Sequence, residues 1–423
     1  MAQAQHQESV TAAHWQIDQH SLAQGLNAVE KQAFAQYQNN AGRHWQDARA
    51  LAAVQPITKS DSSVYSKINS AVESLRRHAD TLVVVGTGGA SLGAQALCAF
   101  APQAASVLFL ENCDAHSVQK IFTRCDLSRT AWAVISKSGE TVETLAASLA
   151  FIAEYEAKKI PLKDRVIAIT SQGDRPLRAL ATSQQWALMD HPAELGGRFS
   201  VFSCVGLLPA AFAGLDIAAL GGTARMAWDT ALGNHDPEIY AAASWFAASL
   251  TAHPLHVVMA YSDRLRPYTQ WYKQLWAESL GKNGRGPTPV TATGSIDQHS
   301  QLQLYLDGTH DKLFTLILPE GRSESVTLAA VDLPGISYLG GHVMEDIMQA
   351  SAEATVDTIR AKDLPLRVLR APLNATTLCQ LMVRTMLETL LVAAMLGVDP
   401  YSQPAVEEGK HRARRSLGLA DHG

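Results

Sequence analysis

Hydroxyl side chains cluster between residues 136 and 144, where the sequence reads SKSGETVET. An apolar run at residues 131–135 precedes the cluster and predicts a buried strand, and apolar residues at helical spacing follow it. Ser136, Ser138 and Thr141 therefore lie in a strand-to-helix turn, which we call the hydroxyl turn (residues 136–141). Free backbone N–H groups and the positive end of a helix dipole bind anions at such a turn. The segment predicts a phosphate site, and the alternative is a Ser/Thr-capped helix without a ligand.

Two glycine-rich segments could also approach a ligand. Residues 86–93, GTGGASLG, follow a strand predicted at 81–85, and glycine permits close approach of the backbone. The segment resembles the dinucleotide fingerprint G-x-G-x-x-G, but Ser91 stands where the third glycine belongs. In GGRFS, at residues 196–200, Arg198 follows a glycine pair and could bind an oxyanion. The alternative is a solvated arginine in a surface turn.

Two side chains in the second half could transfer protons. Glu278 lies near the end of an aromatic-rich helix, QLWAESLGK at residues 274–282, and an apolar wall beside its carboxylate would suit a general base. A glutamate in solvent at a helix end is the commoner arrangement. His299 opens a helix predicted at residues 298–306, where a neutral imidazole is favoured. A histidine at that position is more often structural than catalytic.

The composition is that of a large globular protein. The chain has 423 residues, of which 47% are hydrophobic and 18% charged, and this length predicts two or three domains. A net charge of −5 argues against a general polyanion binder, so the basic run KHRARR that begins at Lys410 is not expected to bind nucleic acid. Five scattered cysteines form no CxxC pair, and neither a signal peptide nor a membrane span is expected. We therefore expect a cytoplasmic protein without a membrane partner.

Strand and helix patterns alternate twice along the chain, which predicts two parallel sheets, each covered by helices on both faces. The predicted strands are residues 81–85, 106–111, 131–135, 165–170 and 187–189, and then 255–261, 289–292, 312–319 and 366–370. The predicted divisions are an N-terminal helical segment packed on the first domain (1–60), a first α/β domain (61–215), a helical linker (216–252), a second α/β domain (253–402) and a C-terminal arm (403–423). Asn374 is expected to cap a strongly apolar helix that reaches residue 396.

In their order along the chain, these motifs resemble those of the glucose-6-phosphate isomerase (phosphoglucose isomerase) family. The family's GIGGS turn is similar to residues 86–90, and its SKTFTT-x-ET loop is similar to residues 136–144. The elements GGRFS and Q-L-x-x-E-S-x-G-K match residues 196–200 and 274–282, and the elements G-Q-H-S and QP-x-V-E-x-GK are similar to residues 297–300 and 403–410. The resemblance implies two doubly wound sugar isomerase domains in tandem.

The resemblance also implies a reaction and a role for each motif. The activity would be that of an aldose–ketose isomerase of glycolysis and gluconeogenesis, acting on glucose 6-phosphate and fructose 6-phosphate without a metal ion or other cofactor. The implied substrate-binding residues are Ser136, Lys137, Ser138, Thr141, Gly88, Gly89 and Gln403. Glu278 would move a proton between C1 and C2, and Arg198 would stabilise the cis-enediolate. His299 and Lys410 would assist ring opening, with His299 supplied by the neighbouring subunit of a homodimer.

The sequence departs from the family pattern at several motif positions. Ala90 replaces the serine after the glycines, Gly139 and Glu140 replace Phe-Thr, and Glu140 adds a negative charge near the expected phosphate. Asp297 replaces the glycine before Gln-His, and Leu280 replaces an asparagine. None of these changes removes a proposed catalytic group. A non-catalytic sugar-phosphate sensor on the same fold and a nicotinamide-dependent dehydrogenase are the alternatives.

Overall fold

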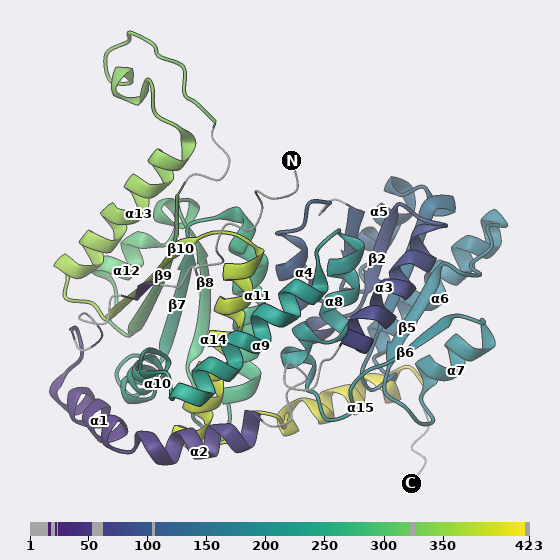
Figure 1. Ribbon diagram of the computed structural model, residues 1–423, viewed down its shortest axis with the longest axis horizontal. Coiled ribbons are helices and arrows are strands. Elements are labelled where there is room, and N and C mark those ends of the chain that lie inside the picture. The colour runs from purple at the N-terminus through teal and green to yellow at the C-terminus, as the bar shows by residue number, and fades with distance from the viewer. Residues whose placement is uncertain are drawn as a thin grey trace, which may run out of the picture.

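The computed structural model describes residues 16–17, 22, 24–52, 62–103, 106–321 and 326–418. It contains two five-stranded sheets that lie beside each other (Figure 1). The first sheet has the order β3-β2-β4-β5-β6 and is parallel throughout. Its strands are β2 (Thr81–Val85), β3 (Val107–Leu110), β4 (Thr130–Ile135), β5 (Val166–Thr170) and β6 (Ala187–Asp190).

The second sheet has the order β1-β10-β9-β7-β8. Its strands are β1 (Gln16–Ile17), β7 (Leu255–Ala260), β8 (Thr288–Thr293), β9 (Lys312–Glu320) and β10 (Leu366–Pro372). All neighbouring pairs are parallel except β1 with β10, which is antiparallel. The predicted class, two parallel α/β sheets in tandem, is confirmed.

Helices cover both faces of the first sheet because its strands are buried on both sides. Leu82 and Val84 of β2 enter one hydrophobic core, whereas Val83 and Val85 enter another, as the two-residue period of a strand requires. The first core is covered by α3 (Ser62–Arg76), α4 (Leu92–Cys98) and α8 (Cys204–Phe212). The second is covered by α5 (Ala115–Arg124), α6 (Val142–Lys158) and α7 (Pro176–Ser183).

The second sheet is covered in the same way. One face packs against α10 (Pro237–Ser249), α11 (Arg266–Leu280) and α14 (Ala375–Leu396). The other face packs against α12 (Leu302–Asp307) and α13 (Met344–Ala361). The core under α10, α11 and α14 is continuous with the core under α4 and α8. The helices between the two sheets therefore form one hydrophobic core, which holds the two halves of the protein together.

The N-terminal helices α1 (Ala28–Asn39) and α2 (Ala41–Ala52) lie on α10 and α14, so their expected position on the first domain is wrong. The buried Glu30 carboxylate lies 2.8 Å from Nδ1 of His253, and the Tyr240 hydroxyl donates to the Tyr37 carbonyl oxygen at 2.5 Å. A buried carboxylate is stable only with such a partner, and it holds α1 against the second half. The rest of the predicted segment, residues 1–15, 18–21, 23 and 53–61, lies outside the described residues.

The two ends of α14 are set as the sequence predicts. The Asn374 side chain accepts a hydrogen bond from the Thr377 N–H at 3.0 Å, and the helix ends at Gly397, whose φ is 65°. In the described part of the chain, α14 is the one helix whose length and composition would allow it to cross a membrane. Its apolar window is 83% buried within the protein, where it packs against α9 (Ile217–Asn234), α10 and α11. Here α14 acts as a core helix.

Candidate active site

A cavity of about 470 Å³ opens between the two halves of the molecule. Its walls come from the turns that follow β2, β4, β5 and β6, from α11, and from the C-terminal segment. The cavity contains nine of the predicted site residues: Gly89, Ser136, Lys137, Ser138, Thr141, Arg198, Glu278, Gln403 and Lys410. Motifs spread over most of the chain thus meet in one place.

The hydroxyl turn runs directly from β4 into α6, as expected. Ser136 Oγ lies 2.9 Å from Thr141 Oγ1 and accepts a hydrogen bond from the Gly139 N–H at 3.1 Å. Gly139 has a φ of 68°, and a Cβ there would lie 2.8 Å from the Cβ of Arg175. A glycine at position 139 is therefore required by this tight turn. The turn presents hydroxyl groups beside the first turn of α6, an arrangement suited to an anion.

The negative charge at Glu140 is neutralised by two arginines. Its carboxylate lies 2.9 Å from Arg414 Nη1 and 3.6 Å from Arg175 Nη1, and Arg414 also donates to the Glu140 carbonyl oxygen at 3.1 Å. Arg414 belongs to α15 (Glu407–Ser416), a helix that reaches the first half (Figure 1). The same helix carries Lys410, whose exposed ammonium lies 2.8 Å from Glu407. The substitution at position 140 therefore ties the hydroxyl turn to the C-terminal helix.

Three polar side chains hold the Glu278 carboxylate. Gln403 Nε2 donates to Oε2 at 2.7 Å, Arg198 Nη1 lies 3.1 Å from the same oxygen, and Gln274 Nε2 donates to Oε1 at 3.1 Å. The expectation of an apolar wall beside the Glu278 carboxylate is wrong, because Trp271 and the other aromatic residues of α11 are buried in the hydrophobic core. The Glu278 side chain remains 34% exposed, so a ligand can reach the carboxylate.

Arg198 is fixed on several sides. It is 1% exposed, its Nε donates to Ser279 Oγ at 2.8 Å, and its Nη2 donates to the Pro400 carbonyl oxygen. Burial lowers the pKa of Arg198 and the neighbouring Glu278 raises it, and the guanidinium remains charged. A rigid, desolvated cation beside a carboxylate can stabilise a negative charge that develops in a reaction.

The glycine turn after β2 serves to place Arg198. A Cβ on Gly89 would lie 2.3 Å from the carbonyl carbon of Gly197 and 2.6 Å from the Arg198 nitrogen, so two backbones meet there. Gly88 does not line the cavity. It has a φ of 56° and packs on the side-chain amide of Gln274, which a Cβ would approach to 2.6 Å. Because Gly88 has no side chain, it leaves room for the Gln274 amide.

His299 does not line the cavity of its own chain. It is exposed and ends a 3₁₀ turn, Ile296–His299, while α12 begins only at Leu302, so its predicted place at the start of an α-helix is wrong. The Asp297 carboxylate accepts from the Thr293 N–H at 2.6 Å and from the Gln301 amide at 3.0 Å. These bonds replace a regular helix start with a tighter turn.

The sequence analysis missed several residues of the cavity wall. They are Thr87, Ser171, Arg175, His191, Gln274 and Tyr401. Ser171 and His191 directly follow β5 and β6, and the carboxyl ends of parallel strands meet at one edge of a sheet, so their position carried a usable signal. The Lys137 side chain also lines the cavity, and burial, together with the charge of Arg198, lowers its pKa.

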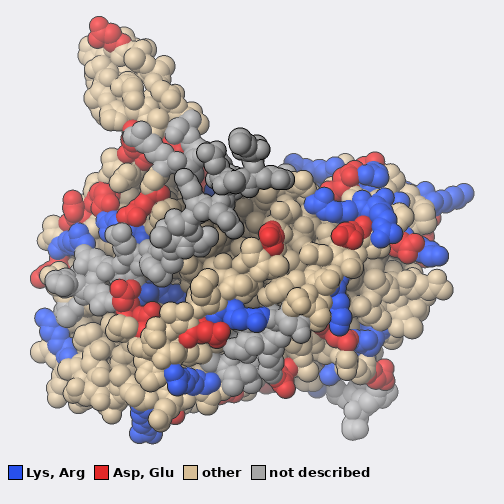
Figure 2. Space-filling model, viewed as in Figure 1, with Lys and Arg blue, Asp and Glu red and all other residues tan. Residues whose placement is uncertain are grey.

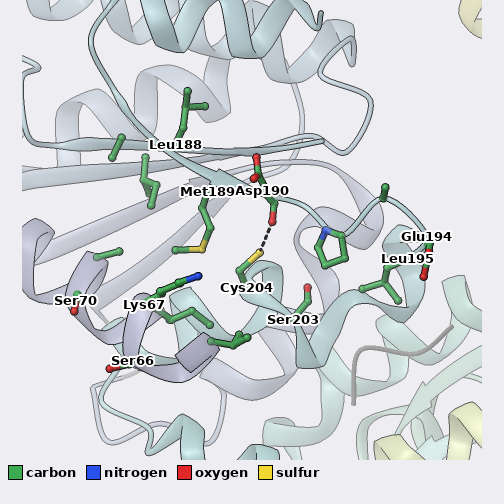
Figure 3. A pocket seen from close by; sticks show the side chains of 17 residues that line it. Ser66, Lys67, Ser70, Leu188, Met189, Asp190, Glu194, Leu195, Ser203 and Cys204 are labelled. Carbon is green, nitrogen blue, oxygen red and sulfur yellow. Dashed lines mark hydrogen bonds between the residues drawn. The ribbon is translucent and has the colours of Figure 1, made fainter. Parts of the chain in front are cut away.

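A larger cavity, of about 870 Å³, lies between α3 and β6 (Figure 3). Figure 3 shows the Cys204 sulfur directed at the Asp190 carbonyl oxygen, and the two atoms lie 3.5 Å apart. Most of the lining is apolar, and none of the predicted site residues reaches it. The smaller cavity is therefore the candidate active site. Among the described residues, no group of three or more His, Cys, Asp or Glu side chains could hold a metal ion.

Comparisons with known proteins identify the family of the chain. The sequence matches the phosphoglucose isomerase family over residues 47–310, more than half of the chain. It is 38% identical over 340 residues to a probable glucose-6-phosphate isomerase of Haloarcula marismortui, covering 79% of this chain and 78% of the relative. It is 34% identical over 347 residues to a glucose-6-phosphate isomerase of Thermus thermophilus, covering 80% of this chain and 84% of the relative.

Solved structures show the same fold. A hypothetical protein from Thermus thermophilus superposes with a TM-score of 0.85 and 30% identity, over 96% of this chain and 100% of the other. A glucose-6-phosphate isomerase from Chlamydia trachomatis, at 22% identity, superposes with a TM-score of 0.74 over 85% of this chain and 74% of the other, which supports the fold. From the extent of these matches, the chain belongs to the phosphoglucose isomerase family.

Proposed function

We propose that the protein interconverts glucose 6-phosphate and fructose 6-phosphate, a step of glycolysis and gluconeogenesis. Family membership and the names of its relatives support this proposal. The observation that carries it is that the Glu278 carboxylate and the hydroxyl turn share one cavity. A phosphate held in the turn would place the sugar carbons within reach of the carboxylate.

In the proposed reaction, Glu278 takes a proton from one of the two carbons, C1 or C2, and returns it to the other, while a second proton moves between the two oxygens, O1 and O2, of the cis-enediolate. A proton next to a sugar carbonyl is only weakly acidic, so the resulting cis-enediolate needs a cation beside it. Arg198 is the buried cation that lies 3.1 Å from the Glu278 carboxylate. Removal of one such stabilising group typically costs about 100- to 1,000-fold in rate.

The phosphate clamp contributes through orientation. Its binding energy comes from a part of the substrate that does not react, and it fixes the reacting carbons relative to Glu278. Ser136, Ser138 and Thr141, with the Lys137 backbone, form the clamp in this proposal, and Gln403 contacts the substrate while it holds Glu278. No step in this scheme requires a metal ion or a nucleotide.

Ring opening is assigned to Lys410 and to the partner subunit's His299 in a homodimer. Two observations support a second subunit: His299 does not reach the cavity of its own chain, and residues 326–343, before α13, project from the body (Figure 1). Figure 2 shows that this projection carries little charge. Its exposed apolar residues include Val331, Leu333, Ile336 and Tyr338.

A mixing experiment tests the shared site. Glu278→Gln and His299→Ala subunits should each give inactive homodimers. Mixed dimers should regain activity, because one of their two sites then contains both intact residues. If mixing restores nothing although mixed dimers form, His299 acts within its own chain or not at all.

The function itself is tested with a coupled assay on the purified protein in the presence of EDTA. We expect turnover of both sugar phosphates, unchanged by the chelator. Binding of glucose 6-phosphate without turnover would instead indicate a sensor, and loss of activity in EDTA would contradict the metal-independent scheme. A cytoplasmic location and the absence of nucleic-acid or membrane partners are part of the same proposal.

A further inference from the structure

His191 is a cavity residue that the family motifs do not explain. It directly follows β6, and its backbone N–H donates to the Thr170 carbonyl oxygen at 2.9 Å, which holds it beside the end of β5. The residue is only 4% exposed, yet it lines the cavity together with Ser136, Lys137 and Ser171. A polar ring buried this deeply is costly unless its nitrogens find partners.

One ring nitrogen already has a partner. The Nδ1 atom lies 2.9 Å from the Pro192 carbonyl oxygen. Because a carbonyl oxygen only accepts hydrogen bonds, we assign the proton to Nδ1, which leaves a lone pair on Nε2 of the neutral ring. Within the described residues, Nε2 has no hydrogen-bond partner. It is also not one of the unpartnered polar atoms that are fully buried, so it keeps some contact with solvent. The Nε2 lone pair is therefore available to a molecule in the cavity.

Burial keeps the His191 ring neutral. It lowers the pKa of His191 to about 4, the bond to Pro192 opposes this change, and the Lys137 ammonium adds a smaller lowering effect. A lysine next to an unprotonated nitrogen also marks this end of the cavity as suited to an anion. Lys137 belongs to the hydroxyl turn, so the anion in question is the one that the turn would bind.

The other charged groups at this end are already paired. Asp190, the residue before His191, forms an ion pair with Arg178, and Arg175 lies 3.6 Å from Glu140. Because both carboxylates, Asp190 and Glu140, are in ion pairs, neither is free to accept a proton in place of the His191 ring. His191 and Lys137 are therefore the two groups at this end of the cavity whose protonation can respond to a bound anion, and substitution of His191 separates its contribution from that of Lys137.

We propose that Nε2 of His191 contacts the phosphate group of the substrate. The inference rests on the proposed function, since it takes the hydroxyl turn as the phosphate site. A phosphate dianion beside the ring opposes the effect of Lys137 and raises the pKa of His191. At pH 8 a free sugar phosphate is a dianion, because the second pKa of a phosphate ester is about 6. The free His191 ring is neutral at this pH, because its pKa is about 4. Contact between Nε2 and a phosphate oxygen therefore requires a proton between them, and that proton is taken up from solvent when the dianion binds.

Two substitutions separate the roles of the two nitrogens. His191→Asn keeps an N–H donor for the Pro192 carbonyl oxygen and removes Nε2. His191→Gln places an amide near the position of Nε2 and removes the Nδ1 donor. A purely structural role through Pro192 would be preserved in the Asn variant, whereas a phosphate contact would be lost in it and partly kept in the Gln variant.

The test is calorimetric titration with inorganic phosphate at pH 8, in two buffers with different heats of ionisation. We expect net proton uptake on phosphate binding to the unmodified protein and less uptake in either variant. Affinity should fall about tenfold in His191→Asn and less in His191→Gln. In the isomerase assay, His191→Asn should raise KM about tenfold and change kcat less than about threefold.

Phosphate affinity and proton uptake that persist in a folded His191→Asn protein would overturn the proposal. Should that variant fail to fold, unchanged proton uptake in His191→Gln would overturn it equally. Because inorganic phosphate binding is measured without turnover, the test is independent of the reaction. Proton-linked binding in a protein that does not isomerise sugars would leave this inference standing and remove the proposed function.

Discussion

A methyl group should be far more damaging at position 89 than at position 197, although the two glycines face each other. A Cβ on Gly89 would lie 2.3 Å from the Gly197 carbonyl carbon and 2.6 Å from the Arg198 nitrogen. A Cβ on Gly197 would lie 3.5 Å from the Gly89 Cα, which is an ordinary contact. Neither glycine has a positive φ, so space alone distinguishes the two positions.

The size of the effect follows from the distance that must be gained. Ordinary carbon contacts lie at about 3.5–4.0 Å, so Gly89→Ala forces the two turns apart by roughly 1 Å. Overpacking of this kind costs about 1–3 kcal/mol of stability. The displaced turn carries Arg198, now 3.1 Å from Glu278, and a misplacement of about 1 Å can reduce the rate about 100-fold.

Steady-state kinetics and thermal unfolding of both variants provide the test. Gly89→Ala should lose about 100-fold in kcat and unfold at a lower temperature. Gly197→Ala, the matched control, should keep both properties nearly unchanged. Equal losses in the two variants, or a normal rate in Gly89→Ala, would refute the argument that the close approach at Gly89 positions Arg198.

Three further predictions concern two charged residues of the site and the cap of α14. Arg414→Met removes the partly exposed ion pair to Glu140, worth about 0.2–1 kcal/mol. KM should therefore rise by at most about fivefold at low salt, and this difference should shrink in about 1 M NaCl, as kinetics at both salt concentrations would reveal. Lys137 should lose its charge at a lower pH than an ordinary lysine, because burial and Arg198 lower its pKa. KM should thus increase as the pH rises through that value, and Lys137→Arg, which stays charged, should abolish the increase in a pH series. Asn374→Ala removes the cap of α14, so it should cost about 1 kcal/mol in a denaturation experiment and leave kcat unchanged.

The positions of the strands could be predicted because parallel strands that are buried on both faces appear as apolar runs. The runs that become β2 and β4 are clear examples, since nearly every residue in them is buried. The hydroxyl turn could equally be predicted from the sequence, because a strand, three hydroxyl residues and a helix follow each other directly along the chain. Such local features carry their own signal in the sequence.

Contacts between distant segments could not be predicted in this way. The bond between Arg414 and Glu140 joins residues 274 positions apart, and neither residue type indicates the other. The place of α1 is fixed in part by a pair of buried residues that are far apart in the sequence, Glu30 and His253. His299 is a different case, since its proposed role depends on a second chain, which no pattern within one chain describes.

The most direct test of the central claim is the isomerase rate of Glu278→Gln beside its affinity for glucose 6-phosphate. The glutamine can still meet Arg198 and Gln403, but it cannot take a proton from carbon. We expect kcat to fall at least about 100-fold, the usual contribution of a general base, while calorimetry shows an affinity within about threefold of the unmodified protein. A near-normal rate, or a loss of binding that accounts for the whole defect, would contradict the account.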